Sequence, residues 1–170
     1  DSGFPGSAVS VIFHSMGNRI LKNISNPRLL KHMPRFLFTN IIINAAAVKR
    51  QNHARWVERL NIQKRIYITM NETDFNLRGA TILRLAEQLG SGLKQKRMRA
   101  ENALYIDFNG LETVEHNLFL ENPELEEKNP NIFRFYDIAF RSEEVKLPEN
   151  AGVHILRPSA KSFLFSDKKS

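Results

Sequence analysis

The chain has 170 residues, 42% of them hydrophobic and 25% charged, which is typical of a single globular domain with a sizeable core. It has no cysteine, which excludes a disulfide scaffold, a thiol nucleophile and a thiolate metal site. No apolar run approaches the ~20 residues of a membrane-spanning helix. These features lead us to expect a cytoplasmic protein without a membrane span.

The net charge of +7 brings nucleic acid into consideration as a partner, but the basic residues do not form one stripe. Lys94–Arg99 is a basic cluster, whereas residues 121–127 are rich in glutamate. Phe133, Phe135 and Phe140 are spaced like the buried face of a helix, and no motif for stacking on single-stranded bases is present. We therefore expect a solvated basic loop and no nucleic-acid partner.

Short apolar runs along the chain predict the strands of a sheet. Four of them are separated by helical patterns: Val9–Phe13, Phe38–Asn44, Arg65–Met70 and Ala103–Phe108. The first three are almost continuously apolar, as expected for parallel strands that are covered on both faces. Residues Val153–Leu156 predict one further short strand.

Helical patterns lie between and after these runs. The candidates are Gly17–Asn23, His53–Leu60, Arg78–Leu89 (followed by Gly90) and Asn131–Arg141. Strands that alternate with helices predict an α/β fold, with a parallel sheet covered by helices on both faces.

The remaining segments read as loops and a tail. We expect an exposed basic loop at Leu93–Asn102 and an acidic loop at Glu121–Asn131. The predicted organisation is one partial α/β domain over residues 1–145, followed by a partly flexible extension over residues 146–170.

The turn after the first strand reads His14-Ser15-Met16-Gly17-Asn18. A serine on a sharp turn between a buried strand and a helix has the layout of a nucleophile elbow. Such a turn lifts the hydroxyl off the end of the sheet, where a base can take its proton. Backbone N–H groups at the start of the helix can then receive the oxyanion.

Other polar residues follow the later strands. Asn71–Asp74 come after the third strand and Asn109–His116 after the fourth, while the small residues Ala45–Ala47 follow the second. Ligands of open α/β sheets bind beyond the carboxyl ends of the strands, so one site could gather Ser15, Asp74 and His116. These are the residue types of a catalytic triad.

Alternatives remain at two of these positions. Asp107 is a rival acid, and Glu112 and Glu115 lie close to His116 in the sequence. Asp74 could instead cap a helix. His116 could be an ordinary surface residue. It is favoured as the base over His32, His53 and His154 because it follows a predicted strand in the right chain order.

At this point the chain resembles the α/β-hydrolase superfamily, and more narrowly a group of uncharacterised bacterial hydrolases whose elbow reads Ala-His-Ser-Met-Gly-Asn. The resemblance covers residues 9–141 and rests on His14–Asn18, Asn71–Leu77 and His116. It implies that the four strands are the fifth to eighth of the family sheet and lie next to one another. The fold would then be the C-terminal half of an α/β-hydrolase.

The resemblance also implies roles for individual residues. Ser15 would be the nucleophile, Asp74 the acid and His116 the base, with the Met16 N–H as one oxyanion donor. The family places a small residue two positions before the serine, where this chain has Phe13.

The first four strands of the family sheet, and the loop that supplies a second oxyanion donor, have no counterpart in these residues. We therefore expect a piece of a longer protein, whose strand Val9–Phe13 presents an apolar edge to a further chain segment or partner.

The predicted function is hydrolysis of a small-molecule ester-like bond through an acyl-enzyme, by an esterase-like or lipase-like serine hydrolase that is active if the missing half is supplied. The alternative is a catalytically inactive remnant of this fold that serves as a binding or interaction module. We expect no cofactor and no metal, because no ligand-spaced histidine or carboxylate cluster appears.

Overall fold

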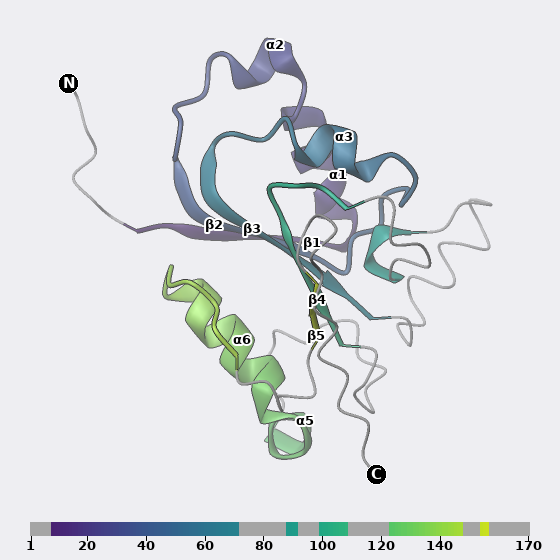
Figure 1. The fold of residues 1–170 in the computed structure, drawn as a ribbon, viewed down its shortest axis with the longest axis vertical. Helices are drawn as coiled ribbons and strands as arrows, with labels where there is room; N and C mark the ends of the chain where they lie inside the picture. Colours follow the sequence, from purple (N-terminus) through teal and green to yellow (C-terminus); the bar gives the residue numbers. More distant parts are fainter. Residues whose placement is uncertain (1–7, 72–87, 92–98, 109–122, 148–153, 157–170) are drawn as a thin grey trace.

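A computed structural model describes residues 8–71, 88–91, 99–108, 123–147 and 154–156. These residues form one five-stranded sheet with helices on both faces (Figure 1). The strands lie side by side in chain order: β1 (Ser10–His14), β2 (Phe38–Asn44), β3 (Gln63–Met70), β4 (Leu104–Asp107) and β5 (His154–Leu156). Strands β1 to β4 are parallel, and β5 is antiparallel to β4.

The four predicted parallel strands are confirmed: β2 has the predicted ends, and the ends of the others shift by at most two residues. They are also adjacent to one another, and the additional short strand predicted at Val153–Leu156 is β5. The chain is therefore an α/β protein, with the carboxyl ends of four neighbouring strands gathered at one edge of the sheet.

Two short helices cover one face of the sheet. Helix α1 (Asn18–Ile24) and helix α3 (His53–Val57) pack Leu21, Trp56 and Val57 into a mainly aliphatic core with residues of β2 and β3. The predicted helix at His53–Leu60 is three residues too long, because the chain turns after Val57, where the Leu60 N–H donates to the Val57 carbonyl oxygen. The helix predicted at Gly17–Asn23 is α1.

A small helix that the sequence analysis did not predict, α2 (Pro27–Leu30), follows α1. The Asn26 side chain accepts a hydrogen bond from the Arg28 N–H, and Pro27 occupies the first helical position, where its missing N–H has no cost.

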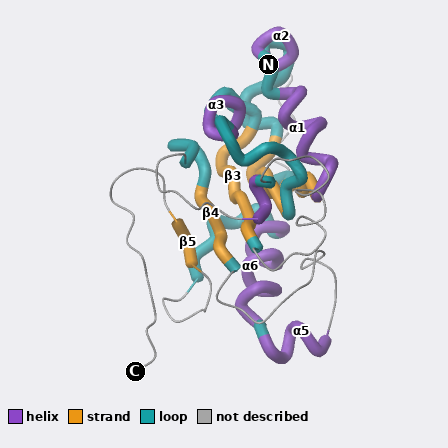
Figure 2. The backbone as a smooth tube through the Cα atoms, turned by 90° about the vertical axis from the view of Figure 1, so that its right-hand side faces the viewer, coloured by secondary structure: helices purple, strands orange, loops and turns teal. Residues whose placement is uncertain are grey.

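The opposite face is covered by α6 (Pro130–Phe140), as Figures 1 and 2 show. Phe135 and Tyr136 of this helix pack against Tyr67 and Phe108 of the sheet side. The prediction of a buried helix at Asn131–Arg141 is confirmed. However, Phe140 is 42% exposed and does not belong to its buried face.

The prediction of an acidic loop at Glu121–Asn131 is wrong for its described part. Residues Pro123–Lys128 form helix α5, which begins at a proline and carries Glu124 and Glu126 in its first turn. Negative charge at the amino end stabilises a helix, because it interacts favourably with the helix dipole. Lys128 Nζ also lies 2.7 Å from Glu124 Oε1, one turn away, which adds an ion pair along the helix.

Other predictions fall largely outside the described residues. These are the helix at Arg78–Leu89, the basic loop at Leu93–Asn102 and most of the extension from residue 146. At their described ends, Leu89 lies in a 3-10 turn (Leu89–Ser91, η2) instead of an α-helix, and residues 99–102 form neither helix nor strand. The division into a domain over 1–145 and an extension stays a prediction.

Candidate functional site

Ser15 lies directly after the carboxyl end of β1 and has a backbone φ of 48°. This left-handed conformation is uncommon for any residue other than glycine and costs about 1–2 kcal/mol. The chain then forms a 3-10 turn over Ser15–Gly17 (η1) and enters α1. The predicted strand, sharp turn and helix are all present, with the backbone strain at the serine itself.

Gly17 does not account for this sharp turn. Its φ of −56° and ψ of −26° are ordinary helical values. A Cβ atom at this position would meet nothing within 4 Å in the described part of the chain. The strained residue is therefore the one that carries the hydroxyl.

Three hydrogen bonds hold the Ser15 carbonyl oxygen in place, one of them from the backbone N–H of Asn18. The same oxygen also accepts from Asn18 Nδ2 at 3.1 Å and from the Ala47 N–H at 3.2 Å. Asn18 Nδ2 also donates to the Asn44 carbonyl oxygen at 3.0 Å, and the Asn18 side chain is fully buried. The end of β2 and the loop after it thus fix the strained turn, as required for an unfavourable φ to persist.

A buried polar cluster lies beneath the turn, with the Asn44 side chain at its centre. The hydroxyls of Thr69 and Tyr136 donate to Asn44 Oδ1 at 2.7 and 2.5 Å. Asn44 Nδ2 then lies 3.0 Å from His14 Nδ1, which is the acceptor in this arrangement, so the ring proton is on Nε2. Burial raises the pKa of the Tyr136 hydroxyl, which keeps it protonated as a donor.

The end of β2 repeats the geometry of the end of β1. His14 pairs with Asn44 across the two strands, and the residue that follows each of them has a positive φ: 48° at Ser15 and 41° at Ala45. The Ala45 N–H donates to Thr69 Oγ1 at 3.4 Å. Strain at neighbouring strand ends is typical of a functional site.

The structure describes two of the four predicted site residues. Ser15 lies in the turn, directly after β1. Met16 follows it, with a side chain that is 56% exposed. Asp74 and His116 lie outside the described residues, so their proximity to Ser15 stays a prediction.

All three alternative histidines lie among the described residues, and His154 is the first residue of β5, where it pairs with Asp107 of β4. His53 is fully buried: its Nδ1 donates to the Arg50 carbonyl oxygen at 2.8 Å, and its Nε2 lies 2.6 Å from the Tyr105 hydroxyl. Burial lowers the pKa of His53. Its ring belongs to the core, whereas His32 is exposed beyond α2.

The rival acid Asp107 is the last residue of β4 and is half-buried. It therefore lies at the same edge of the sheet as Ser15, two strands beyond β2. The other carboxylates considered, Glu112 and Glu115, lie outside the described residues.

Sequence reasoning missed the cluster around Asn44. The only signal was a polar residue directly after the three isoleucines of β2, and its partners on β3 and α6 are distant in the sequence. His14 also contacts this cluster through Asn44, while Asn18 and Arg19 bind the end of β2 and the loop that follows it.

Within the described ranges, no three His, Asp or Glu side chains come together as a metal site. Among the helices of those ranges, none has the length and apolar character needed to cross a bilayer.

Comparisons of this chain with protein-family models, with curated proteins and with solved structures gave no match. The class that the fold and site define is thus an α/β protein with a strained serine at the carboxyl edge of a parallel sheet.

Proposed function

We propose that this protein is a serine hydrolase that cleaves an ester-like bond through an acyl-enzyme. The observation that carries the proposal is the left-handed Ser15 between β1 and α1, with its carbonyl oxygen held by Asn18 and Ala47. A strained serine that projects from a strand-to-helix turn is the defining feature of a nucleophile elbow. The adjacent parallel strands support a C-terminal half of an α/β-hydrolase fold.

In the proposed reaction, Ser15 Oγ attacks the ester carbonyl carbon while His116 takes the hydroxyl proton. Asp74 orients His116 and stabilises its charged form, and the Met16 N–H receives the oxyanion. His116 then gives the proton to the leaving alkoxide, which departs as an alcohol. Water hydrolyses the acyl-Ser15 ester by the same steps in reverse order.

The proposal is tested by labelling the folded chain with a fluorophosphonate probe, which reacts with activated serines. Ser15→Ala is expected to abolish labelling. Ser142→Ala is the matched control, because Ser142 also has a positive φ of 64° but lies after α6. Labelling that persists in Ser15→Ala, or disappears in Ser142→Ala, would contradict the assignment.

The partners of Ser15 are tested in the same assay. His116→Ala and Asp74→Asn are each expected to slow labelling by ~10²-fold or more, because the hydroxyl loses its base or the base loses its orientation. Normal labelling of His116→Ala, with strong loss of labelling in His53→Gln, would show that His116 is not the base.

A second candidate is an inactive remnant that acts as an interaction module. The observation in its favour is that β1 lies at the edge of the sheet, where β2 is its only strand partner among the described residues. Met16 and Ile20 beside it are 56% and 61% exposed. A folded chain that shows no labelling and self-associates in sedimentation experiments would favour this candidate.

A further inference from the structure

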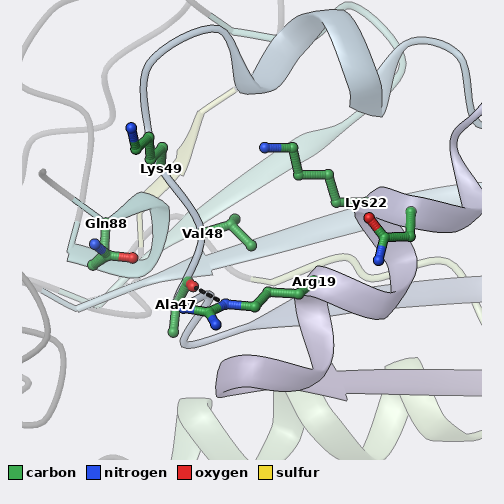
Figure 3. A pocket seen from close by; sticks show the side chains of 7 residues that line it. Arg19, Lys22, Ala47, Val48, Lys49 and Gln88 are labelled. Atoms are coloured by element: carbon green, nitrogen blue, oxygen red, sulfur yellow. Dashed lines mark hydrogen bonds between the residues drawn. The ribbon is translucent and has the colours of Figure 1, made fainter. Parts of the chain in front are cut away.

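A pocket of about 350 Å³ opens beside the strained turn (Figure 3). One wall is a face of α1 that carries Arg19, Lys22 and Asn23, and the other is the loop after β2 with Ala47, Val48 and Lys49; Gln88 completes the lining. The volume is at the lower end of the range for small-molecule sites, which is roughly 300–1,000 Å³.

The lining is strongly cationic. Among the described residues, the lining contains three basic side chains and no carboxylate, and no carboxylate of those residues forms an ion pair with Arg19, Lys22 or Lys49. Figure 3 shows Lys22 extending from α1 toward the segment that carries Val48 and Lys49, while Arg19 reaches Ala47. Three like charges around one opening repel each other, and an anion in the pocket would relieve that repulsion.

The loop wall of this pocket is fixed to neighbouring backbone. The Leu89 N–H donates to the Val48 carbonyl oxygen at 2.9 Å, and the Gly90 N–H donates to the Ala46 carbonyl oxygen at 3.1 Å. Lys49 and Gln88 form a β-bridge. The position of Lys49 is therefore set before any ligand binds, which reduces the entropic cost of binding.

The pocket is also connected directly to Ser15. Ala47 donates its N–H to the Ser15 carbonyl oxygen at 3.2 Å and accepts from Arg19 Nε at 3.5 Å through its own carbonyl oxygen. Arg19 lies one helical turn after Ser15 in the chain. A ligand group in the pocket would therefore lie beside the proposed nucleophile, at the carboxyl edge of the sheet.

We propose that this pocket binds an anionic oxygen group, phosphate or carboxylate, and that the substrate is a small ester that carries such a group. The part that concerns the substrate rests on the proposed hydrolase function, whereas anion binding does not. Arg19 supplies a planar guanidinium that can donate two hydrogen bonds to an oxyanion, and Lys22 and Lys49 supply point charges.

Anion binding is tested by titrating the full chain with inorganic phosphate, and separately with succinate, at low ionic strength and following backbone amide shifts by NMR. We expect shifts at residues 19–23 and 47–49, and weaker binding as NaCl is added. Lys22→Gln and Lys49→Gln are each expected to weaken binding by about fivefold. The stronger of the two anions identifies the group that the pocket takes.

Arg134→Gln is the matched control, because it removes the same charge from an exposed position on α6, across the sheet. It is expected to leave the titration unchanged. Circular dichroism shows whether the Lys22→Gln/Lys49→Gln double variant is folded. A folded double variant that binds each anion as tightly as wild type does would overturn the proposal.

Substrate preference is tested with a neutral ester, 4-nitrophenyl acetate, and an anionic one, the mono-4-nitrophenyl ester of succinate. The kcat/KM for the anionic ester, divided by that for the neutral ester, is expected to fall at least fivefold in the double variant. A general loss of activity cancels in that ratio. An unchanged ratio would overturn the substrate assignment. Anion binding in a chain that fluorophosphonate does not label would contradict the hydrolase function and retain the anion site.

Discussion

The two faces of the sheet are built in different ways. On one face, the 11-residue helix α6 packs aromatic rings edge to face, with Phe135 5.8 Å from Tyr67 and 6.0 Å from Phe108 between ring centroids. On the other face, the helices α1 and α3 have seven and five residues and cover a mainly aliphatic core that also contains Trp56 and Tyr105. The cationic pocket lies on the side of these short helices, beside the strained turn.

Both faces bury hydrophobic side chains, whereas the strained turn and the cationic pocket lie together where α1 leaves the sheet. One contact joins the two regions, because the Tyr136 hydroxyl of α6 reaches Asn44 at the end of β2. Changes on either side of that contact can show how far the two regions are independent.

The largest expected effect is that of Phe135→Ala on the aromatic face. Phe135 is fully buried and contacts three aromatic rings, so its loss leaves a cavity that lowers the free energy of unfolding by about 3–5 kcal/mol. Urea denaturation measures this change, and Phe140→Ala at a 42% exposed site is the control. A similar small loss in both variants would contradict the assignment of the core to this face.

Asn44→Ala breaks the contact between the regions and is expected to have the next largest effect. It leaves the buried hydroxyls of Thr69 and Tyr136 without their acceptor, which lowers the free energy of unfolding by roughly 2–3 kcal/mol. Tyr136→Phe is the matched control, with an expected loss of about 1 kcal/mol, because Asn44 Oδ1 keeps its bond from Thr69. Thermal denaturation measures the loss of unfolding free energy in both variants. Equal losses in Asn44→Ala and Tyr136→Phe would show that Asn44 does not hold the cluster together.

The His14 tautomer is a direct readout of the same link. In wild type, ¹⁵N chemical shifts are expected to show the ring proton on Nε2, since Nδ1 accepts from Asn44. In Asn44→Ala this preference is expected to weaken.

On the aliphatic face, burial of His53 predicts a dependence of stability on pH. Its pKa is lowered below the usual 6.5 in the folded chain, so the unfolded chain binds the proton more readily. The stability contribution is complete above about pH 6.5 and is lost as the pH falls toward the folded-state pKa. The expected slope is at most about 1.4 kcal/mol per pH unit.

Denaturation curves between pH 7.5 and 5.5 measure this slope. His53→Gln is expected to remove it, whereas His32→Gln at an exposed position is expected to leave it unchanged. The same slope in His53→Gln and wild type would show that other groups cause the pH dependence.

The smallest expected effect concerns the strain at Ser15. Glycine accepts a φ of 48° at no steric cost, so Ser15→Gly is expected to raise the free energy of unfolding by about 0.5–1 kcal/mol while abolishing fluorophosphonate labelling. Phe36→Gly is the control, since Phe36 has a φ of 57° and is 62% exposed. It is expected to retain labelling. A destabilised Ser15→Gly variant would contradict the view that strain is stored at the nucleophile.

Local patterns were sufficient to place most elements. The apolar runs located β1 to β4, and the helical spacing of apolar residues over Asn131–Arg141 located α6, although Phe140 lies outside its buried face. Helix α5 was mistaken for a loop because glutamate and proline are common in loops, whereas Pro123 and Glu124 are favourable at the start of a helix.

The sequence by itself determined the α/β class, the position of Ser15 after a strand, and the candidates Asp74 and His116, since these depend on chain order and local periodicity. Only the tertiary structure decided that Asn44, Thr69 and Tyr136 meet beneath the turn and that Arg19, Lys22 and Lys49 surround one pocket. Those contacts join residues far apart in the chain, and the register and packing of the sheet select them. The local sequence around these residues does not distinguish them from other polar residues of the same types.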